Sequence, residues 1–210
     1  MRVYHLPPHP TCLIFDIDST LYTCPEYAHE QIDSQIRHFA DLRGMTHEAA
    51  RALIAEERRA YAAAHDGKKI SLGNLFTRLG ITIEESIEWR KTLFDPADFL
   101  RRDERLIAAL AELQKRFRLV CVTNNPVLPA QKTLCALGVE NLIEQTVGLD
   151  TCMKSKPARE MLERAALAPF SECVSIGDRY DIDLALPLEL GMGAILVSGA
   201  EDVYELPDIL

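Results

Sequence analysis

The sequence predicts an α/β fold in which a parallel sheet lies between two layers of helices, with a helical segment inserted early in the chain. Three observations lead to this prediction. After residue 100, short apolar runs alternate with segments whose apolar residues recur at helical spacing. Residues 22–97 show almost no strand pattern. Several apolar runs end in acidic, hydroxyl or amide residues, and open parallel sheets bind ligands at such strand ends.

Five short apolar runs are expected to form the sheet. They are bounded by polar or turn-forming residues and are too short to be helices. The first run precedes the inserted segment, and the third is the weakest. The five runs are Thr11–Phe15, Leu119–Val122, Glu144–Gly148, Cys173–Ile176 and Ala194–Val197.

Helices are expected between the later strands. They are predicted at Asp103–Arg116, Pro129–Leu137, Pro157–Leu167 and about Ile182–Leu190. The first of them carries Leu106 and Leu110 on one face. Gly138 follows the second helix directly, as is common at a helix end. Pro187 lies inside the fourth and should kink or shorten it.

The inserted segment is expected to form a helical domain. Its predicted helices are Tyr27–Leu42, Thr46–His65, Ser71–Leu79 and a fourth that ends before Asp95-Pro96. Thr82 and Glu85 have the spacing of a capping box, which begins the fourth helix. We therefore expect residues 1–21 and 98–210 to form a core and residues 22–97 to form an α-helical cap.

The composition excludes several classes of function. A chain of 210 residues, 48% hydrophobic and 26% charged, suits one domain with an insertion or two small domains. A net charge of −9 disfavours a nucleic-acid surface, and no apolar run reaches membrane-spanning length. The six cysteines form no C-x-x-C pair, and the first residues lack a signal-peptide pattern. We therefore expect a cytoplasmic protein with neither nucleic-acid nor membrane partners.

Asp16 and Asp18 are the leading candidates for chemistry. They follow the first predicted strand, at the position where an open parallel sheet binds ligands. Two carboxylates separated by one residue can act as nucleophile and as general acid/base. Taken alone, the same residues could simply form a turn or cap a helix.

Three later segments supply further polar groups. The second strand ends in Thr123 and two asparagines, Lys156-Pro157 precedes a helix, and the fourth strand breaks at Gly177 into acidic residues. In this order, the segments resemble the four signature motifs of the haloacid dehalogenase superfamily. The matching residues are Asp16, Asp18 and Thr20 in the first motif, Thr123 in the second, Lys156 in the third, and Asp178 with Asp183 in the fourth.

The resemblance implies a Rossmann-like three-layer core, a helical cap inserted after the first motif, and a Mg²⁺-dependent phosphomonoester hydrolase. It implies that Asp16 attacks phosphorus and forms an aspartyl-phosphate. Asp18 would protonate the leaving alcohol and then activate water. Dehalogenases of the superfamily lack an acid at this position, so Asp18 favours phosphoryl transfer.

The resemblance also implies a metal site. The carboxylates of Asp16 and Asp178 and the main-chain carbonyl of Asp18 would hold Mg²⁺, because this ion prefers hard oxygen ligands. Asp183 and Asp181 are candidates to support that site. Either acid could instead simply begin the next helix.

The phosphate would be held by the remaining motif residues. Thr123 and the main-chain N–H of Asn124 would donate to its oxygens, and Lys156 would neutralise negative charge. Lys154 is a competitor two residues away, but the family's Lys-Pro pair favours Lys156. Asn125 is expected only to shape the turn before Pro126.

The run from Phe15 to Tyr22 resembles the pyrimidine 5′-nucleotidase branch, although Ser19 stands where that branch usually has Asn. We therefore expect a small phosphorylated metabolite as the substrate, with nucleoside monophosphates first and sugar phosphates or phosphoglycolate next. A phosphomutase and a non-catalytic phosphate-binding module are alternatives. Lys68 and Lys69 could approach a second anionic group, although a solvated loop is the simpler interpretation. We expect a monomer or a homodimer.

Overall fold

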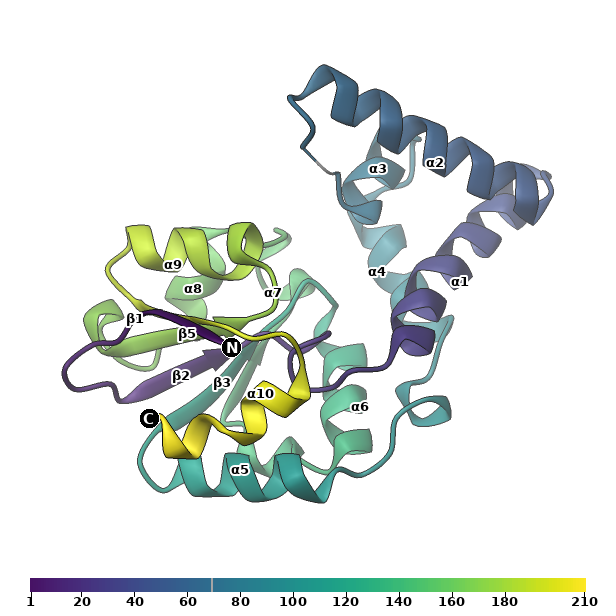
Figure 1. Cartoon of the computed structure of the whole chain (residues 1–210). Coiled ribbons are helices and arrows are strands. Elements are labelled where there is room, and N and C mark those ends of the chain that lie inside the picture. Colours follow the sequence, from purple (N-terminus) through teal and green to yellow (C-terminus); the bar gives the residue numbers. More distant parts are fainter. Residues whose placement is uncertain (69) are drawn as a thin grey trace. The chain divides into compact units, whose positions relative to one another are not determined.

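The computed structural model describes residues 1–68 and 70–210, and these form two compact units (Figure 1). The first unit comprises Met1–Pro25 and Asp95–Leu210, and the second comprises Glu26–Phe94. The inserted segment expected from the sequence, residues 22–97, is a few residues longer at each end than the second unit.

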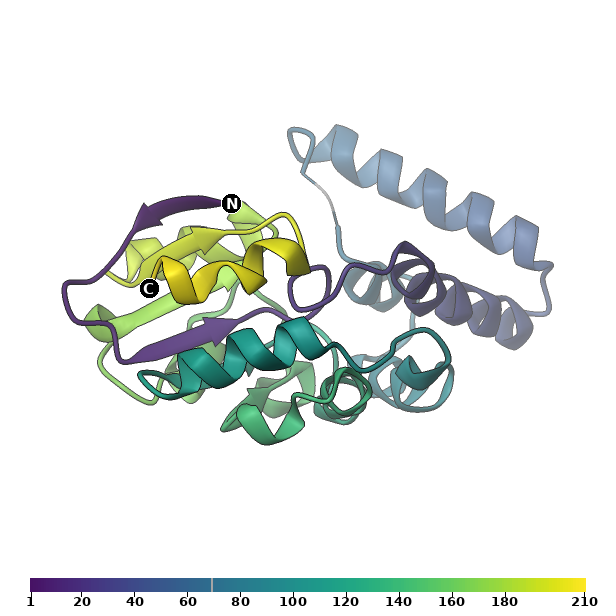
Figure 2. The same cartoon turned by 60° about the horizontal axis from the view of Figure 1, so that its bottom comes forward.

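The first unit contains a six-stranded sheet in the order β1-β6-β5-β2-β3-β4 (Figures 1 and 2). β2 is parallel to β3 and β5, β3 is parallel to β4, and β5 is parallel to β6. The bounds are β1 (Arg2–His5), β2 (Cys12–Phe15), β3 (Arg118–Val122), β4 (Gln145–Val147), β5 (Cys173–Gly177) and β6 (Gly193–Leu196). The predicted α/β fold is thus confirmed, and all five predicted strands are present.

β1 is a strand that the sequence does not predict. It runs antiparallel to β6 at the edge of the sheet, with Val3 opposite Ile195. Three of its four residues are exposed, so it shows neither an apolar run nor a clear alternation. Its pairing depends on the open edge of β6, which is a feature of the folded sheet and not of the local sequence.

Helices cover both faces of the sheet, with α8 and α9 on one face and α5 and α10 on the other (Figures 1 and 2). The α-helices of this unit are α5 (Glu104–Gln114), α6 (Val127–Leu137), α7 (Leu149–Cys152), α8 (Arg159–Ala165), α9 (Ala185–Glu189) and α10 (Ala200–Tyr204). Short 3₁₀ turns lie at Pro96–Asp98, Glu140–Leu142, Phe170–Glu172 and Leu206–Asp208. None of the helices in the described part of the chain is both long and apolar enough to cross a membrane.

The helix predicted near Pro187 has two parts. A π-helical turn, Tyr180–Leu184, leads into α9, and Pro187 is the third residue of α9. Pro187 has no N–H for the carbonyl of Asp183, four residues earlier, and that carbonyl accepts the Ser175 hydroxyl instead. The α-helix on this stretch spans only Ala185–Glu189, so it is shorter than the predicted Ile182–Leu190, as a proline inside the run led us to expect.

The register of the central strands brings three strand ends to one level. β2 is buried along its whole length. Phe15, its last residue, pairs with Cys121 of β3 and with Ile176 of β5. The residues that follow these three strands therefore meet at the carboxyl edge of the sheet, and this edge holds the candidate site.

The described residues of the second unit form helices and connecting loops, without strands. The helices are α1 (Pro25–Arg43, which begins at the boundary), α2 (His47–Ala64), α3 (Leu72–Arg78) and α4 (Ile83–Thr92). Thr82 and Glu85 form the predicted capping box at the start of α4. Phe39, Phe76 and Trp89 lie in a hydrophobic core within this unit.

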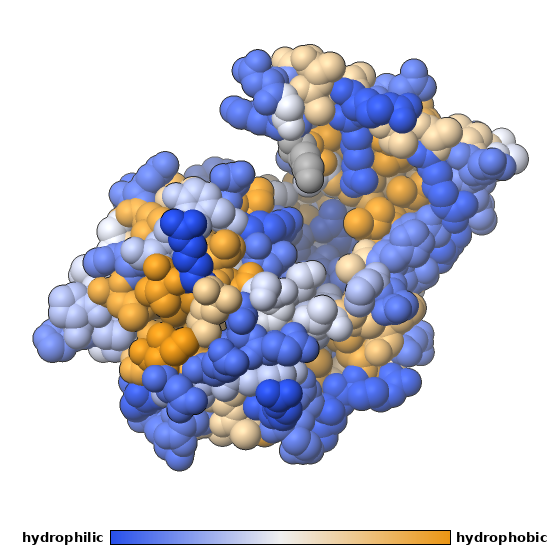
Figure 3. Space-filling model, viewed as in Figure 1, coloured by the Kyte–Doolittle hydropathy of each residue, from blue (hydrophilic) through white to orange (hydrophobic). Residues whose placement is uncertain are grey.

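On the face shown in Figure 3, hydrophilic residues (blue) cover much of the surface and separate the hydrophobic patches (orange).

Candidate active site

Asp16 lies directly after β2, at the centre of the carboxyl edge. Its main-chain N–H donates to the carbonyl of Ile176 at 2.8 Å. This hydrogen bond extends the parallel ladder by one residue and fixes the backbone from which the Asp16 side chain projects. The side chain is only 2% exposed. Its Oδ1 atom accepts a hydrogen bond from Lys156 Nζ at 2.5 Å. Its Oδ2 atom is buried and has no hydrogen-bond partner among the residues that the structure describes.

Lys156 joins three parts of the site. Its ammonium donates to Asp16, to Asp183 Oδ1 at 2.7 Å and to the main-chain carbonyl of Val122 at 3.0 Å. Its main-chain N–H donates to Asn124 Oδ1 at 2.6 Å, so the loop after β3 also fixes the lysine backbone. All three protons of this buried ammonium thus have acceptors.

Asp183 reaches the site from the π-helical turn. Its Oδ2 atom accepts the main-chain N–H of Arg179 at 3.0 Å, and its own carbonyl accepts the Ser175 hydroxyl at 2.8 Å. The approach is close, because a Cβ on Gly177 would lie 2.5 Å from the Asp183 Cβ. Glycine is therefore required at the end of β5. Asp181, the other predicted supporting acid, is exposed.

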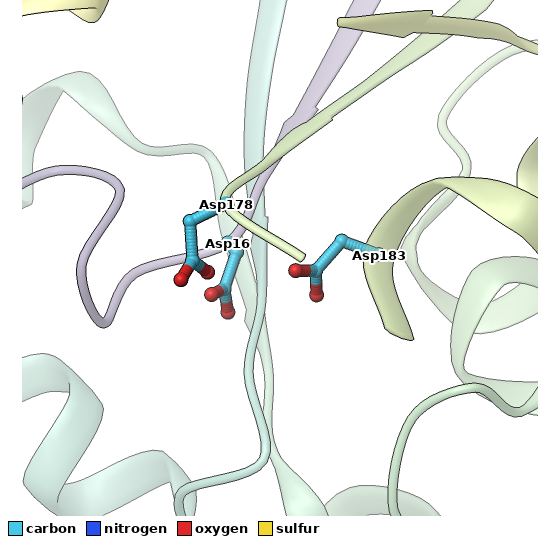
Figure 4. Close-up of side chains that lie close together, drawn as sticks. All are labelled: Asp16, Asp178 and Asp183. Atoms are coloured by element: carbon cyan, nitrogen blue, oxygen red, sulfur yellow. The ribbon is translucent and has the colours of Figure 1, made fainter. Parts of the chain in front are cut away.

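Asp178 follows β5 and completes a group of three carboxylates with Asp16 and Asp183 (Figure 4). One oxygen of each residue lies within 4.8 Å of the others. Asp178 Oδ1 is buried and accepts no hydrogen bond from the described residues, and the nearest cation is Arg179, with its Nε 3.6 Å away. Burial is the main cause that raises the pKa of Asp178.

The charges of this group are unbalanced. Burial, with further repulsion from Asp183 and Asp18, raises the pKa of Asp16 from 3.8 to about 7, although Lys156 opposes the shift. Burial also disfavours the charged form of Lys156, but Asp16 and Asp183 outweigh it and raise the lysine pKa. The two shifts favour a neutral acid beside a charged amine. The two shifts are consistent because several carboxylates share one ammonium. Each carboxylate therefore has too little positive charge nearby, whereas the lysine has more than one negative partner.

A divalent cation fits this imbalance. Asp16 Oδ2 and Asp178 Oδ1 are two buried carboxylate oxygens without hydrogen-bond partners. Such atoms are costly to bury unless a proton or a cation satisfies them. The donor set consists of hard oxygens, which suits Mg²⁺ better than a thiophilic metal. The residues present are therefore those that a magnesium site would need.

Asp18 is turned toward the loop after β3. Its Oδ2 atom accepts from Asn125 Nδ2 at 3.0 Å and from the Thr123 hydroxyl at 3.3 Å. Its Oδ1 atom accepts from the Tyr22 hydroxyl at 2.6 Å. Sequence reasoning gave Asn125 only a turn-shaping role and gave Tyr22 none. The spacing of four residues between Asp18 and Tyr22 is a signal that could have indicated their contact.

Ser19 is one of the few non-glycine residues with left-handed backbone, at φ +60°. It lies in the turn that follows Asp18, where Thr20 and Leu21 both donate their N–H groups to the carbonyl of Ile17. Asparagine adopts this conformation more readily than serine. This explains why asparagine suits this position of the motif and why Ser19 is a less favourable occupant.

Arg179 is a second residue that the sequence did not single out. Its side chain is 50% exposed, and its Nε lies 3.9 Å from Asp183 Oδ2. Burial disfavours its charge, but the carboxylates of Asp16, Asp183 and Asp178 raise its pKa. The guanidinium is thus a partly exposed cation at the edge of the acidic group.

Comparison with known proteins identifies the family. The profile of the haloacid dehalogenase-like hydrolases matches residues 10–187, which include all four motifs. The chain belongs to the haloacid dehalogenase-like (HAD) hydrolase family. A phosphoglycolate phosphatase from Colwellia psychrerythraea is 38% identical over 72 residues, which are 33% of this chain and 32% of that protein. The match thus spans about a third of the relative's length.

Solved structures share the fold of this HAD hydrolase. A HAD phosphatase from Thermococcus onnurineus has a TM-score of 0.66 at 18% identity, with 95% of this chain and 97% of that chain covered. The HAD hydrolase YfnB from Bacillus subtilis, solved bound to magnesium, has a TM-score of 0.58 at 15% identity, with 95% and 99% covered. At such identities the likeness establishes the fold alone.

Proposed function

We propose that this HAD hydrolase is a Mg²⁺-dependent phosphomonoesterase that acts through an aspartyl-phosphate on Asp16. The observation that carries the proposal is the environment of Asp16. One of its oxygens is held by Lys156, and the other is buried without a hydrogen-bond partner among the described residues. Asp18, whose carboxylate can transfer a proton, is two residues away in the chain.

The reaction would proceed in two displacements. In the first, the Asp16 carboxylate attacks phosphorus, the bond to the ester oxygen breaks, and Asp18 gives a proton to the leaving alcohol. In the second, Asp18 removes a proton from water, the water oxygen attacks phosphorus, and the Asp16 carboxylate is released with inorganic phosphate. Asp18 ends each cycle with the proton it began with.

Asp16, Asp178 and the main-chain carbonyl of Asp18 would hold Mg²⁺, with Asp183 behind them. When bound, Mg²⁺ would offset the repulsion between the Asp16 carboxylate and the anionic phosphate. Asp183 shares Lys156 with Asp16 and so fixes the position of the ammonium. Asp181 is exposed, which favours Asp183 as the supporting acid.

The phosphate would be held by donors from the loops after β3 and before α8. Lys156 would act through its positive charge, because its three ammonium protons already have acceptors. Asn124 would use its main-chain N–H while its side chain holds the Lys156 backbone. Thr123 donates to Asp18 in this structure, so binding a phosphate oxygen would require its hydroxyl to turn. Rotation of a hydroxyl is a small change.

The substrate is proposed to be a small phosphorylated metabolite. The Phe15-to-Tyr22 run supports nucleoside monophosphates, whereas the curated relative is named a phosphoglycolate phosphatase. We propose that the second unit, Glu26–Phe94, is the cap that selects among such substrates. YfnB is described as undergoing an interdomain movement, and a comparable movement here would be the cap's means of selection. Of the two cap lysines noted in the sequence, Lys69 lies outside the described residues.

A trapping experiment tests the function. The purified protein is incubated with Mg²⁺ and a panel of nucleoside monophosphates, sugar phosphates and phosphoglycolate, and released phosphate is measured. Acid quenching followed by peptide mass spectrometry should place one phosphoryl group on Asp16. Asp16→Asn should fold normally, release no phosphate and carry no such group. Phosphate release by this variant at the wild-type rate would reject the assignment.

A further inference from the structure

The Asp18 carboxylate accepts hydrogen bonds from two different segments of the chain. The Tyr22 hydroxyl contacts Oδ1 at 2.6 Å, and the Asn125 amide contacts Oδ2 at 3.0 Å. One donor comes from the turn after β2 and the other from the loop after β3. The last side-chain torsion of an aspartate is only weakly restricted, so its carboxylate can rotate over a wide range. Two donors on different oxygens remove that freedom.

Tyr22 is well placed to act as one of these donors. It follows Asp18 by four residues, across the turn in which Thr20 and Leu21 donate to the carbonyl of Ile17. The residue is only 4% exposed. A buried phenol requires a hydrogen-bond partner, and Asp18 provides one. The ring is therefore packed while its hydroxyl is committed to the carboxylate.

Asn125 is held by its own main chain. Its N–H donates to the Thr123 hydroxyl at 3.1 Å, and its carbonyl accepts from Leu149 N at 2.9 Å. Gly148 packs so closely that an added Cβ would lie 2.7 Å from the Asn125 carbonyl oxygen. The amide thus projects from a fixed backbone. This is more than a turn before a helix requires.

We propose that Tyr22 and Asn125 are positioning residues that hold the Asp18 carboxylate in one orientation for proton transfer. The proposal rests on the proposed phosphomonoesterase function. A carboxylate that gives and takes a proton must keep the same orientation toward the substrate when it is protonated and when it is ionised. Hydroxyl and amide groups can meet this need, because a hydroxyl can donate or accept and an amide can turn over to present its oxygen.

Leaving-group dependence separates positioning from general damage. Tyr22→Phe and Asn125→Ala are compared with the wild type on an alkyl phosphate and on an aryl phosphate whose leaving group needs no proton. On the alkyl phosphate we expect each variant to lower kcat by about 10- to 100-fold, with KM changed by no more than about twofold. On the aryl phosphate the loss in the first step should be several-fold smaller.

Tyr204→Phe is a matched control. The Tyr204 hydroxyl also donates to an aspartate, Asp103, at 2.6 Å, and the pair is part-buried. This variant removes an equal hydrogen bond outside the site, so kcat on both substrates should stay at the wild-type value. In an Asp18→Asn background, Tyr22→Phe should cause no further loss, because the carboxylate it positions is already gone.

A structural measurement tests the proposal independently of activity. Crystal structures of Tyr22→Phe and Asn125→Ala should show the Asp18 carboxylate rotated or in more than one conformer, whereas the wild type shows one. An unchanged Asp18 in both variants would overturn the proposal, and so would equal losses in the first step on both substrates, measured in a single turnover. Absence of phosphate release by the wild type would instead reject the proposed function, and the crystal structures would still decide the positioning claim.

Discussion

Lys156 Nζ lies 2.5 Å from Asp16 Oδ1, although 140 positions separate the two residues in the chain. Both side chains are almost fully buried, at 7% and 2% exposure. Removing two charges from water is expensive, and their attraction seldom repays that cost in stability alone. The pair is therefore better understood as part of a reactive site, in which a nucleophilic carboxylate and its counter-charge are held together before the substrate arrives.

The first prediction concerns this lysine. Lys156→Met should lower the free energy of unfolding by about 3–5 kcal/mol, because Asp16 and Asp183 remain buried without it. It should also lower kcat by about 100-fold or more, because a charge that stabilises the transferring phosphoryl group is lost. Urea denaturation and phosphate release measure the two effects.

Lys154→Met is the control for that prediction. Lys154 is exposed and pairs with Glu160 at the surface, where ion pairs contribute little. Both the stability and the rate of this variant should match the wild type. Reversed results for the two lysines would transfer the role assigned here from Lys156 to Lys154.

The second prediction concerns the metal. Mg²⁺ should raise the melting temperature of the wild-type protein, because an ion that binds only the folded state stabilises it. Asp178→Asn should abolish that rise, since it replaces one of the buried unpaired carboxylates. Asp181→Asn should preserve it, because Asp181 is exposed. Differential scanning fluorimetry with and without chelator gives the result, and an equal Mg²⁺ response in all three proteins would rule out Asp178 as a ligand.

The third prediction is a pH dependence of stability in chelator. The folded-state pKa of Asp16 is about 7 and lies above its ordinary value of 3.8, so between these pH values the folded protein holds a proton that the unfolded chain has released. The contribution of Asp16 to the free energy of unfolding must therefore fall as pH rises through this window. Asp16→Asn cannot ionise at this position. The free energy of unfolding of the wild type should therefore fall relative to that of the variant as the pH rises through this window. Urea denaturation at several pH values measures it, and a difference that stays constant would contradict the raised pKa.

The fourth prediction concerns the glycine at the end of β5. Gly177→Ala places a Cβ 2.5 Å from the Asp183 Cβ and must displace that residue. Overpacking of this kind costs about 1–3 kcal/mol, and it should also reduce kcat, because Asp183 shares the ammonium of Lys156. Gly191→Ala has no atom within 4 Å of the new Cβ and suffers only from its positive φ. It should lose stability while keeping its kcat, so equal kcat in the two variants would show that Asp183 need not be held this closely.

The sequence predicted the parts of the fold that local forces specify. The apolar run ending at Phe15 is a fully buried strand, and Thr82 with Glu85 forms the expected capping box. Gly138 ends α6 with left-handed backbone at φ +77°. Each of these features involves hydrogen bonds or side-chain spacing within a few residues, so a linear pattern is enough to recognise it.

The sequence could predict which residues form the candidate site, but not which of them contact one another. Strand ends with polar groups identified Asp16, Thr123 and Asp178, because parallel strands present their carboxyl ends at one edge. The pattern could not choose between Asp181 and Asp183, since a π-helical turn carries them and its period differs from that of an α-helix. The structure brings Asp183 to Lys156 and leaves Asp181 exposed.

The sequence by itself determined the order of the five parallel strands, the helical insertion and the identity of the polar groups at the strand ends. Only the tertiary structure decided that β1 completes the sheet, that Asn125 binds Asp18, and that Lys156 contacts both Asp16 and Asp183. The physical reason is distance along the chain. Local structure follows from contacts within about one turn, whereas these contacts join segments that meet only when the whole sheet has formed.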